Sequence, residues 1–345
     1  MGMTLDEVLA RFREEAQGNL AVMGSRFEGL VHNLLLSHPL YKEEVARVWR
    51  WADFPARSQL TPTGTDAGID LVAQTHFGDY WAIQCKCYAP DTTVSKPDVD
   101  SFLALSSKTF TWDTRPARFA QRLIFASTDR WNATAEETLR NQTPPVTKVA
   151  YAQLAALEVD WEALLKGRED FCVKHDARPH QLKAMAAAHA HFAAHDRGLL
   201  VMACGTGKTL TALRLMEQEL PQGGLVLFLV PSIALLNQTL VSWSEEARLP
   251  LTPICVCSDA TASKKKRGDT DTAPESLVDL AAPACTDPRV VAVHVQTARR
   301  NNPAALTVVF STYQSIGVVG QVQRELGRDA FPFDFIVCDE AHRTT

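Results

Sequence analysis

Apolar residues in the first half of the chain recur with two different spacings. Between Phe27 and Leu35 they fall three and four residues apart, which predicts a helix with one buried face. Residues 69–75 and 80–88 instead alternate, which is the pattern of a β-hairpin. Further helices are expected at 96–108 and 132–142, and further strands at 122–128 and 148–152. Strands that alternate with helices in this way predict an α/β fold with a mixed sheet.

The second half contains short runs that are apolar at almost every position. Strands are expected at 198–203, 224–230, 306–312 and 333–340. Such runs are typical of a parallel sheet that is covered by helices on both faces. Residues 166–176 are polar and break the pattern, so we interpret them as a linker. The chain is therefore expected to hold one domain over 1–165 and a second over 177–345.

Length and composition limit the classes of protein to which the chain can belong. A length of 345 residues with 46% hydrophobic residues suits two soluble domains, and no apolar run is long enough to cross a membrane. The eight cysteines are scattered without a disulfide framework, and the N-terminus lacks the apolar core of a signal peptide. We therefore expect a cytoplasmic protein. The net charge of −5 means that DNA binding would need a local basic patch.

Residues 202–215, "MACGTGKTLTALRL", follow an apolar run and begin a helical pattern. Backbone N–H groups of a glycine-rich turn before a helix form a cradle for phosphates. The predicted cradle consists of Gly205, Thr206 and Gly207. Lys208 can reach the β- and γ-phosphates, and the Thr209 hydroxyl can hold Mg²⁺. Met202 departs from the usual pattern, which has glycine at this position.

A second motif far along the chain completes this site. The apolar run at 333–340 ends on Asp339 and Glu340. A carboxylate at a strand end can hold Mg²⁺, and the next acid can orient the attacking water. The sequence therefore predicts an ATP site with bound Mg²⁺.

These motifs resemble those of superfamily 2 helicases and translocases. "MACGTGKT", "LFLVPSIALLNQ", "VVFSTYQSI" and "DEAHRTT" look like successive helicase motifs, and the wording is closest to motor subunits of DNA restriction enzymes, in which Met202 is common. "RPHQ" resembles the glutamine motif, which implies that Gln181 reads adenine. The resemblance covers about 177–345 and implies a first RecA-like lobe that moves on double-stranded DNA. It also implies a second lobe that is absent here, so we expect weak ATP binding and hardly any hydrolysis.

The register of the hairpin decides which side chains meet. Side chains alternate between the two faces of a strand. A three-residue loop over 76–78 brings the odd-numbered apolar residues of both strands to one face. Asp70 then lies opposite Gln84 on the other, polar face, with Lys86 one step along.

These residue types can form a metal-dependent nuclease. Asp70, the Gln84 amide oxygen and the Cys85 carbonyl are ligands that suit Mg²⁺, and Lys86 can stabilise the developing charge. An upstream carboxylate is also needed, and Glu28 on the first long helix is the best candidate. A plain hairpin, or a fold that no longer cleaves, is the alternative.

The spacing over 20–160 resembles the Mrr-like branch of the PD-(D/E)xK nucleases, on "FEGLV", "GTDAGID" and "QCK". An Mrr-like nuclease joined to a restriction-type motor resembles the type ISP restriction–modification enzymes. This implies an ATP-dependent restriction endonuclease that cleaves foreign DNA, such as phage DNA, within a longer polypeptide. Its further domains would be a second motor lobe, a methyltransferase and a target-recognition domain.

Two other functions are compatible with these residues. One is a standalone nuclease–helicase defence protein without a methyltransferase. The other is a DNA-binding module with an inactive nuclease on a remodelling motor. The polar stretch 258–275 includes "SKKKRGD", which could contact phosphates but is more typical of a solvated loop.

Overall fold

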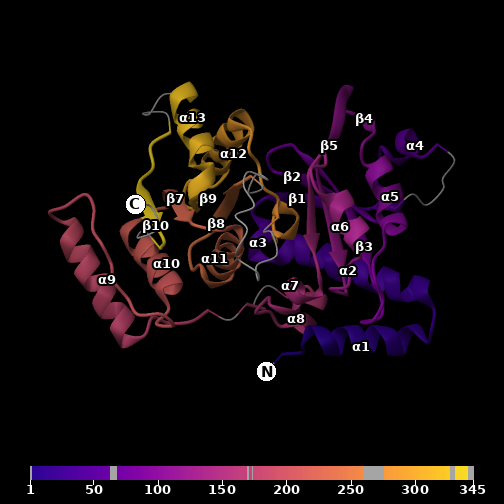
Figure 1. Ribbon diagram of the computed structural model, residues 1–345, viewed down its shortest axis with the longest axis horizontal. Coiled ribbons are helices and arrows are strands. Elements are labelled where there is room, and N and C mark those ends of the chain that lie inside the picture. The colour runs from indigo at the N-terminus through magenta and orange to yellow at the C-terminus, as the bar shows by residue number, and fades with distance from the viewer. Residues whose placement is uncertain are drawn as a thin grey trace, which may run out of the picture. The chain divides into compact units, whose positions relative to one another are not determined.

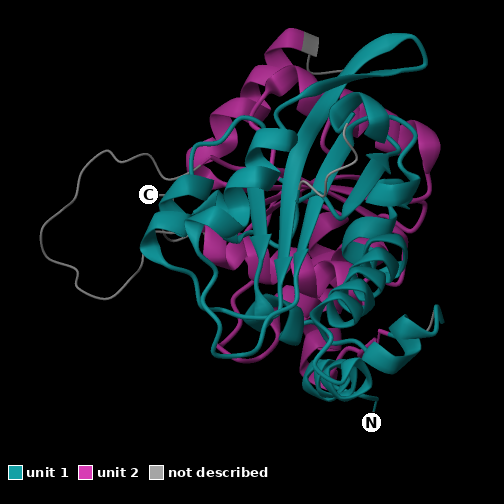
Figure 2. Cartoon of the chain, turned by 90° about the vertical axis from the view of Figure 1, so that its right-hand side faces the viewer, with its two compact units in different colours: residues 1–171, 276–283 teal, residues 172–275, 284–345 magenta. Residues whose placement is uncertain are grey.

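The computed structural model of the chain describes residues 2–62, 68–168, 171–172, 174–258, 276–326 and 331–340. Packing divides the chain into two compact units (Figure 2). Unit 1 comprises residues 1–171 and 276–283, and unit 2 comprises residues 172–275 and 284–345. None of the helices in the described ranges has the length and apolar character needed to cross a bilayer.

Unit 1 is a mixed sheet with helices on its faces (Figure 1). Its strands are β1 (Val45–Arg50), β2 (Leu71–Thr75), β3 (Tyr80–Lys86), β4 (Thr109–Trp112), β5 (Arg115–Ala126) and β6 (Val146–Val149). Its helices are α1 (Leu5–Ala16), α2 (Leu20–Ser37), α3 (Pro39–Lys42), α4 (Arg57–Leu60), α5 (Lys96–Leu105), α6 (Ala133–Leu139), α7 (Tyr151–Ala155) and α8 (Trp161–Leu165), with 3-10 turns η1 (Trp51–Asp53) and η2 (Leu277–Asp279).

The sheet order is β1-β2-β3-β5-β4, and β6 also pairs with β5. The pairs β1–β2, β2–β3 and β4–β5 are antiparallel, whereas β3–β5 and β5–β6 are parallel. The expected α/β fold with a mixed sheet is therefore confirmed for unit 1. The predicted helix at 27–35 lies within α2, where its apolar residues are buried.

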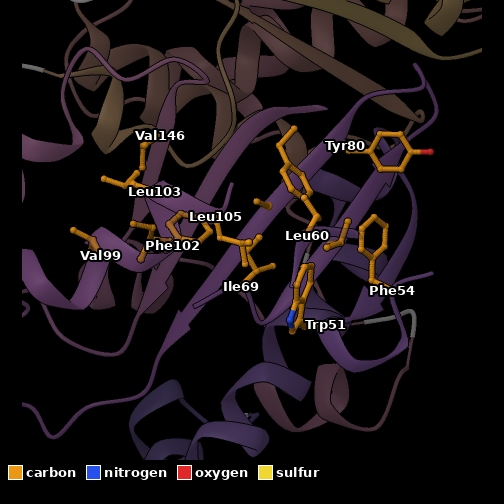
Figure 3. Packing of buried hydrophobic residues seen from close by; sticks show 14 of the residues in the cluster. Trp51, Phe54, Leu60, Ile69, Tyr80, Val99, Phe102, Leu103, Leu105 and Val146 are labelled. Atoms are coloured by element: carbon orange, nitrogen blue, oxygen red, sulfur yellow. The ribbon is translucent and has the colours of Figure 1, made fainter. Parts of the chain in front are cut away.

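The polar face expected for the hairpin is in fact a second buried face. Val72, Tyr80 and Ala82, which alternate with the residues expected to be buried, are at most 5% exposed and belong to a hydrophobic cluster (Figure 3). Phe102 and Leu105 of α5 belong to the same cluster. The expectation of one buried face was wrong because an element later in the chain covers the other face as well.

A buried arginine fixes the C-terminal end of α5. Arg122 on β5 donates hydrogen bonds to the Leu103 and Pro144 carbonyls and to the Ser106 and Ser107 hydroxyls, at 2.6–3.2 Å. Burial lowers the pKa of Arg122 to about 10. A buried cation is tolerated when its donors are satisfied. Arg122 therefore pins α5 to the sheet.

Residues 276–283, which we call the strap, complete unit 1 from a distant part of the sequence. The Tyr41 hydroxyl donates to the Ala281 carbonyl at 2.6 Å, and the Gln153 amide donates to the Asp279 carbonyl at 2.6 Å. Lys148 on β6 forms an ion pair with the Asp279 carboxylate at 2.9 Å. The first domain is thus discontinuous in sequence.

Unit 2 contains a parallel sheet in the order β10-β7-β9-β8. Its strands are β7 (Gly224–Val230), β8 (Leu251–Val256), β9 (Leu306–Thr312) and β10 (Phe335–Cys338). Its helices are α9 (Pro179–Phe192), α10 (Lys208–Glu219), α11 (Ile233–Glu246), α12 (Pro288–Asn301) and α13 (Ile316–Leu326), with the 3-10 turn η3 (Tyr313–Ser315). The parallel sheet predicted for a RecA-like lobe is confirmed.

Three predicted elements differ in the structure. Residues 198–203 form no strand, and Leu199 and Val201 are more than 80% exposed. An apolar run becomes a strand only when a neighbour accepts its backbone hydrogen bonds, and within the described residues this run has none. The strand expected at 148–152 lies at 146–149, and the helix expected at 132–142 ends at Leu139.

Some predicted features lie outside the described residues. These are the lysine-rich stretch 263–269, most of the 258–275 segment, residues 64–67 of the first nuclease motif, and residues 341–345 after the acid pair.

Candidate functional site

The hairpin of β2 and β3 has the predicted register. Leu71 pairs with Ile83 and Gln74 pairs with Tyr80, so that paired residue numbers keep a constant sum. The turn consists of residues 76–78, and Gly78 has a left-handed φ of +94°. The prediction of a three-residue loop is therefore confirmed. Asp70 directly precedes the first of these pairs, so its position opposite Gln84 stays a prediction.

Asp70 is held by the strands on both sides of it. Its N–H donates to the Ile83 carbonyl at 2.9 Å, and its carbonyl accepts from the Trp51 N–H at 2.8 Å. Its carboxylate Oδ2 accepts from the Cys85 N–H at 2.6 Å. These bonds fix the backbone and one carboxylate oxygen. The hydrogen bond from Cys85 involves Oδ2 of the half-buried side chain and not its second carboxylate oxygen.

Glu28 and Asp70 both act electrostatically on Cys85. Burial is the largest cause that raises the pKa of the Cys85 thiol well above its usual range, and the negative charges of Asp70 and Glu28 raise it further. Helix α2 packs against β3, the strand that carries Cys85. That Glu28 shares a metal site with Asp70 stays a prediction.

Gln84 carries an unsatisfied acceptor at the same end of the hairpin. Its side chain is only 1% exposed, and its Oε1 atom has no hydrogen-bond partner among the described residues. Gly68 has a φ of +84°, and a Cβ atom there would lie 3.1 Å from the Gln84 Nε2 atom. Glycine at 68 thus allows the chain to pass close to Gln84. An unpaired buried acceptor costs about 1–3 kcal/mol, so a ligand for it is expected.

Lys86 has a neighbour that the sequence did not indicate. Asp98, near the start of α5, accepts hydrogen bonds from Ser95 and from the Tyr88 hydroxyl. Burial would raise the pKa of Asp98, but these bonds and the positive charge of Lys86 lower it on balance. Lys86 also acts on the Cys85 thiol. The positive charge of Lys86 therefore acts on both Asp98 and Cys85.

The glycine-rich loop of unit 2 has the predicted strained turns. Gly205 and Gly207 have φ values of +75° and +79°, which favour glycine, and Gly207 is the N-cap of α10. Lys208 and Thr209 are the first residues of the helix and are half-buried. The Thr206 hydroxyl donates to the Ala203 carbonyl at 2.7 Å. Such a turn directs backbone N–H groups toward an anion.

Gln181 is packed against this loop. Its Nε2 atom donates to the Thr206 and Gly207 carbonyls at 3.2 Å, and its Oε1 atom accepts from the Arg178 N–H at 2.7 Å. The side chain is 2% exposed. Both the nitrogen and the oxygen of the amide therefore form hydrogen bonds, and Gln181 supports the loop. Adenine reading by Gln181 stays a prediction.

Lys208 of the loop lies close to Glu340 of the acid pair, although the two residues are 132 positions apart in sequence. Lys208 Nζ lies 3.4 Å from a Glu340 carboxylate oxygen. The Asp339 carbonyl accepts from the Tyr313 hydroxyl at 2.7 Å, and burial followed by the nearby Cys338 raises the pKa of Tyr313 to about 12. The parallel sheet therefore assembles the phosphate loop and the acids at one edge, as predicted.

A cavity of about 810 Å³ lies beside these residues in unit 2. Its lining includes Lys208, Thr209 and Asp339 together with the strand β10 and the residues Gly198, Leu199, Leu200 and Met202. Ile336 on β10 is 53% exposed. Among the described residues, this edge of the sheet is therefore left uncovered, and a ligand or another segment of chain can reach it.

Comparison with known proteins assigns each unit to a family. Residues 36–171 match the Mrr_cat_2 family of restriction endonucleases, and residues 174–345 match the ResIII family, the res subunit of type III restriction enzymes. The ATP-dependent type ISP restriction–modification enzyme LlaBIII, solved bound to DNA, aligns with 99% of this chain at 32% identity and a TM-score of 0.74. This chain therefore joins a domain of the Mrr_cat_2 family to a domain of the ResIII family, and over almost its whole length it is similar to a type ISP restriction–modification enzyme.

The chain spans 20% of the length of LlaBIII. A nuclease-deletion mutant of the type ISP enzyme LlaGI, in complex with a DNA substrate mimic, aligns with 49% of this chain and 15% of its own length, at 40% identity and a TM-score of 0.38. No curated protein matches. The two family matches make unit 1 a restriction-endonuclease domain and unit 2 a helicase-family domain.

Proposed function

We propose that this chain cleaves double-stranded DNA with Mg²⁺ in unit 1, and that ATP-driven translocation by unit 2 controls the cleavage. The nuclease and helicase families of the two units support this combination. The two alternatives considered from the sequence, a standalone defence nuclease–helicase and an inactive nuclease on a remodelling motor, gain no support from the structure. Further domains of a longer chain are part of the proposal, as is action on phage DNA in the cytoplasm.

The nuclease centre would hold Mg²⁺ through oxygen atoms of Asp70, Gln84, the Cys85 carbonyl and Glu28. The unpaired, buried Gln84 Oε1 is the observation that carries this assignment, because a cation satisfies a buried acceptor that no donor reaches. When bound, the metal supplies a water of lowered pKa and polarises the phosphate. Lys86 stabilises negative charge on the phosphate oxygens, and Asp98 holds the lysine in position.

The nucleotide site would bind ATP through the loop at Gly205, Thr206 and Gly207. Lys208 neutralises the β- and γ-phosphates, which requires its contact with Glu340 to open. Thr209 and Asp339 are the candidate ligands of Mg²⁺ in this site, and Glu340 orients the attacking water. Gln181 reads adenine only if it releases the Thr206 and Gly207 carbonyls.

Reciprocal substitutions test the proposal. Asp70→Ala and Lys86→Ala should each abolish Mg²⁺-dependent nicking of supercoiled DNA, a loss of at least about a hundredfold, and leave nucleotide binding intact. Lys208→Ala should abolish binding of a fluorescent ATP analogue and leave the metal site intact. Asp91→Ala, an exposed acid of the same unit, serves as the matched control. Nicking by the Asp70 variant at the wild-type rate would rule out the assigned centre.

A further inference from the structure

Arg50 occupies a position between the two acidic elements of the nuclease centre. It is the last residue of β1, and in the strand register it pairs with Leu71, the residue after Asp70. The next residue, Trp51, donates its N–H to the Asp70 carbonyl. The backbone of Arg50 is therefore fixed beside the backbone of Asp70.

The side chain of Arg50 crosses to helix α2. Its Nη1 atom donates to the Ser25 hydroxyl at 3.2 Å, and its Nη2 atom lies 3.5 Å from the position of a Cβ atom on Gly29. Ser25, Glu28 and Gly29 are spaced i, i+3 and i+4, so they share one face of the helix. The guanidinium therefore lies against the turn of α2 that carries Glu28.

The neighbouring cations Arg26 and Arg47 contact an acid and an aromatic ring, whereas Arg50 contacts a hydroxyl. Arg26 on α2 forms an ion pair with Glu15 at 3.2 Å, and Arg47 on β1 stacks over the Trp49 ring. Within the described residues, Arg50 forms no ion pair and its exposed guanidinium uses one donor on Ser25. A guanidinium has five N–H donors in a planar fork, which matches two oxygens of a phosphate.

The chemistry of the proposed centre requires such a cation. Glu28 and Asp70 repel the phosphates of DNA, and a metal ion with Lys86 offsets this charge only at the scissile position. The phosphates on either side need a separate positive group. We propose that Arg50 binds the DNA backbone at a phosphate next to the scissile one, and so seats the strand against Asp70 and Glu28. This inference rests on the proposed nuclease function.

DNA binding as a function of salt tests this role in the intact chain. Binding of a fluorescent 30-base-pair duplex is measured in EDTA over a series of NaCl concentrations for the wild type, Arg50→Ala, Arg50→Lys and the control Arg47→Ala. Loss of one phosphate contact should reduce the slope of log K against log salt by about 1 and weaken binding about tenfold. Arg50→Lys should restore the slope but only part of the affinity, because an ammonium lacks the fork.

Cleavage kinetics provide a second readout. In Mg²⁺, Arg50→Ala should raise KM about tenfold with a smaller change in kcat, because a flanking phosphate contact is made in the ground state as well. Arg47→Ala should change neither value. An unaltered salt slope and KM in Arg50→Ala would overturn the role of Arg50, even where Asp70→Ala abolishes cleavage. Absence of cleavage by the wild type would instead count against the nuclease function, and the salt slope would still decide the role of Arg50.

Discussion

The candidate nuclease centre and the candidate nucleotide loop are held in place in different ways. Gln84 lies on a strand that is buried on both faces, and Asp70 directly precedes β2, where hydrogen bonds with Trp51 and Ile83 fix its backbone. The loop at Gly205 and Gly207 is exposed, and a single buried side chain, Gln181, braces it from α9. The first site is rigid because the sheet core surrounds it, whereas the second depends on a few side-chain contacts.

This difference fits the chemistry proposed for each site. Metal ligands must hold oxygen atoms at fixed positions near 2.1 Å from Mg²⁺, which buried strands provide. A phosphate loop has to admit and release a nucleotide in every cycle, so weak bracing is an advantage there. The contact of Lys208 with Glu340 is also one that a phosphate can replace.

Among substitutions that remove a supporting contact, we expect the largest change from loss of the Gln181 hydrogen bonds to the loop. Gln181→Ala removes hydrogen bonds to the Thr206 and Gly207 carbonyls, each worth about 1 kcal/mol. Nucleotide affinity should fall about tenfold, measured by titration with a fluorescent ATP analogue. His180→Ala, which removes an exposed contact to the same Thr206 carbonyl, is the control and should have less effect. Tighter binding by Gln181→Ala would show that the brace holds the loop in a closed state.

Weakening the contact between the strap and Tyr41 should have a smaller effect, which is a loss of stability confined to unit 1. Tyr41→Phe removes the hydrogen bond to the Ala281 carbonyl and leaves that acceptor buried, which should lower the stability of unit 1 by about 1 kcal/mol. Hydrogen exchange of the β6 amides should become faster, while exchange in β7 stays unchanged. Tyr151→Phe, which removes an exposed hydrogen bond to Asp6, is the matched control. Unchanged β6 exchange in Tyr41→Phe would show that the strap adds no stability.

The smallest expected change is in the reactivity of the Cys85 thiol, which measures how close Glu28 lies to the hairpin. The Asp70 and Glu28 charges raise its pKa, so Glu28→Gln should lower the pKa and increase the thiolate fraction at a fixed pH. Alkylation of Cys85 by iodoacetamide at pH 8.5, followed by mass spectrometry, should become about two- to threefold faster. The wild-type rate should still rise with pH at pH 9, because the thiol pKa lies above that value.

Glu14→Gln, on the exposed face of α1, is the control for this measurement. If Glu28→Gln and Glu14→Gln alkylate at the same rate, Glu28 is too far from the hairpin to share a metal ion with Asp70.

Local sequence patterns determined the parts of this protein that depend on neighbouring residues. The spacing of apolar residues specified α2, and alternation together with Gly78 specified the register that pairs Leu71 with Ile83 and Gln74 with Tyr80. The glycines before Lys208 specified the phosphate loop. In each case the cause is short-range: side-chain direction along a strand or helix, or a backbone conformation that favours glycine.

Only the tertiary structure decided what surrounds those elements. The cover of α5 over the second face of the hairpin left the Gln84 acceptor unpaired and placed Asp98 near Lys86. The run 198–203 has the composition of a strand but lacks a pairing partner among the described residues. The strap belongs to unit 1 although it follows β8 of unit 2 in sequence. Burial and pairing require a second segment, and no local pattern states which distant segment will supply it.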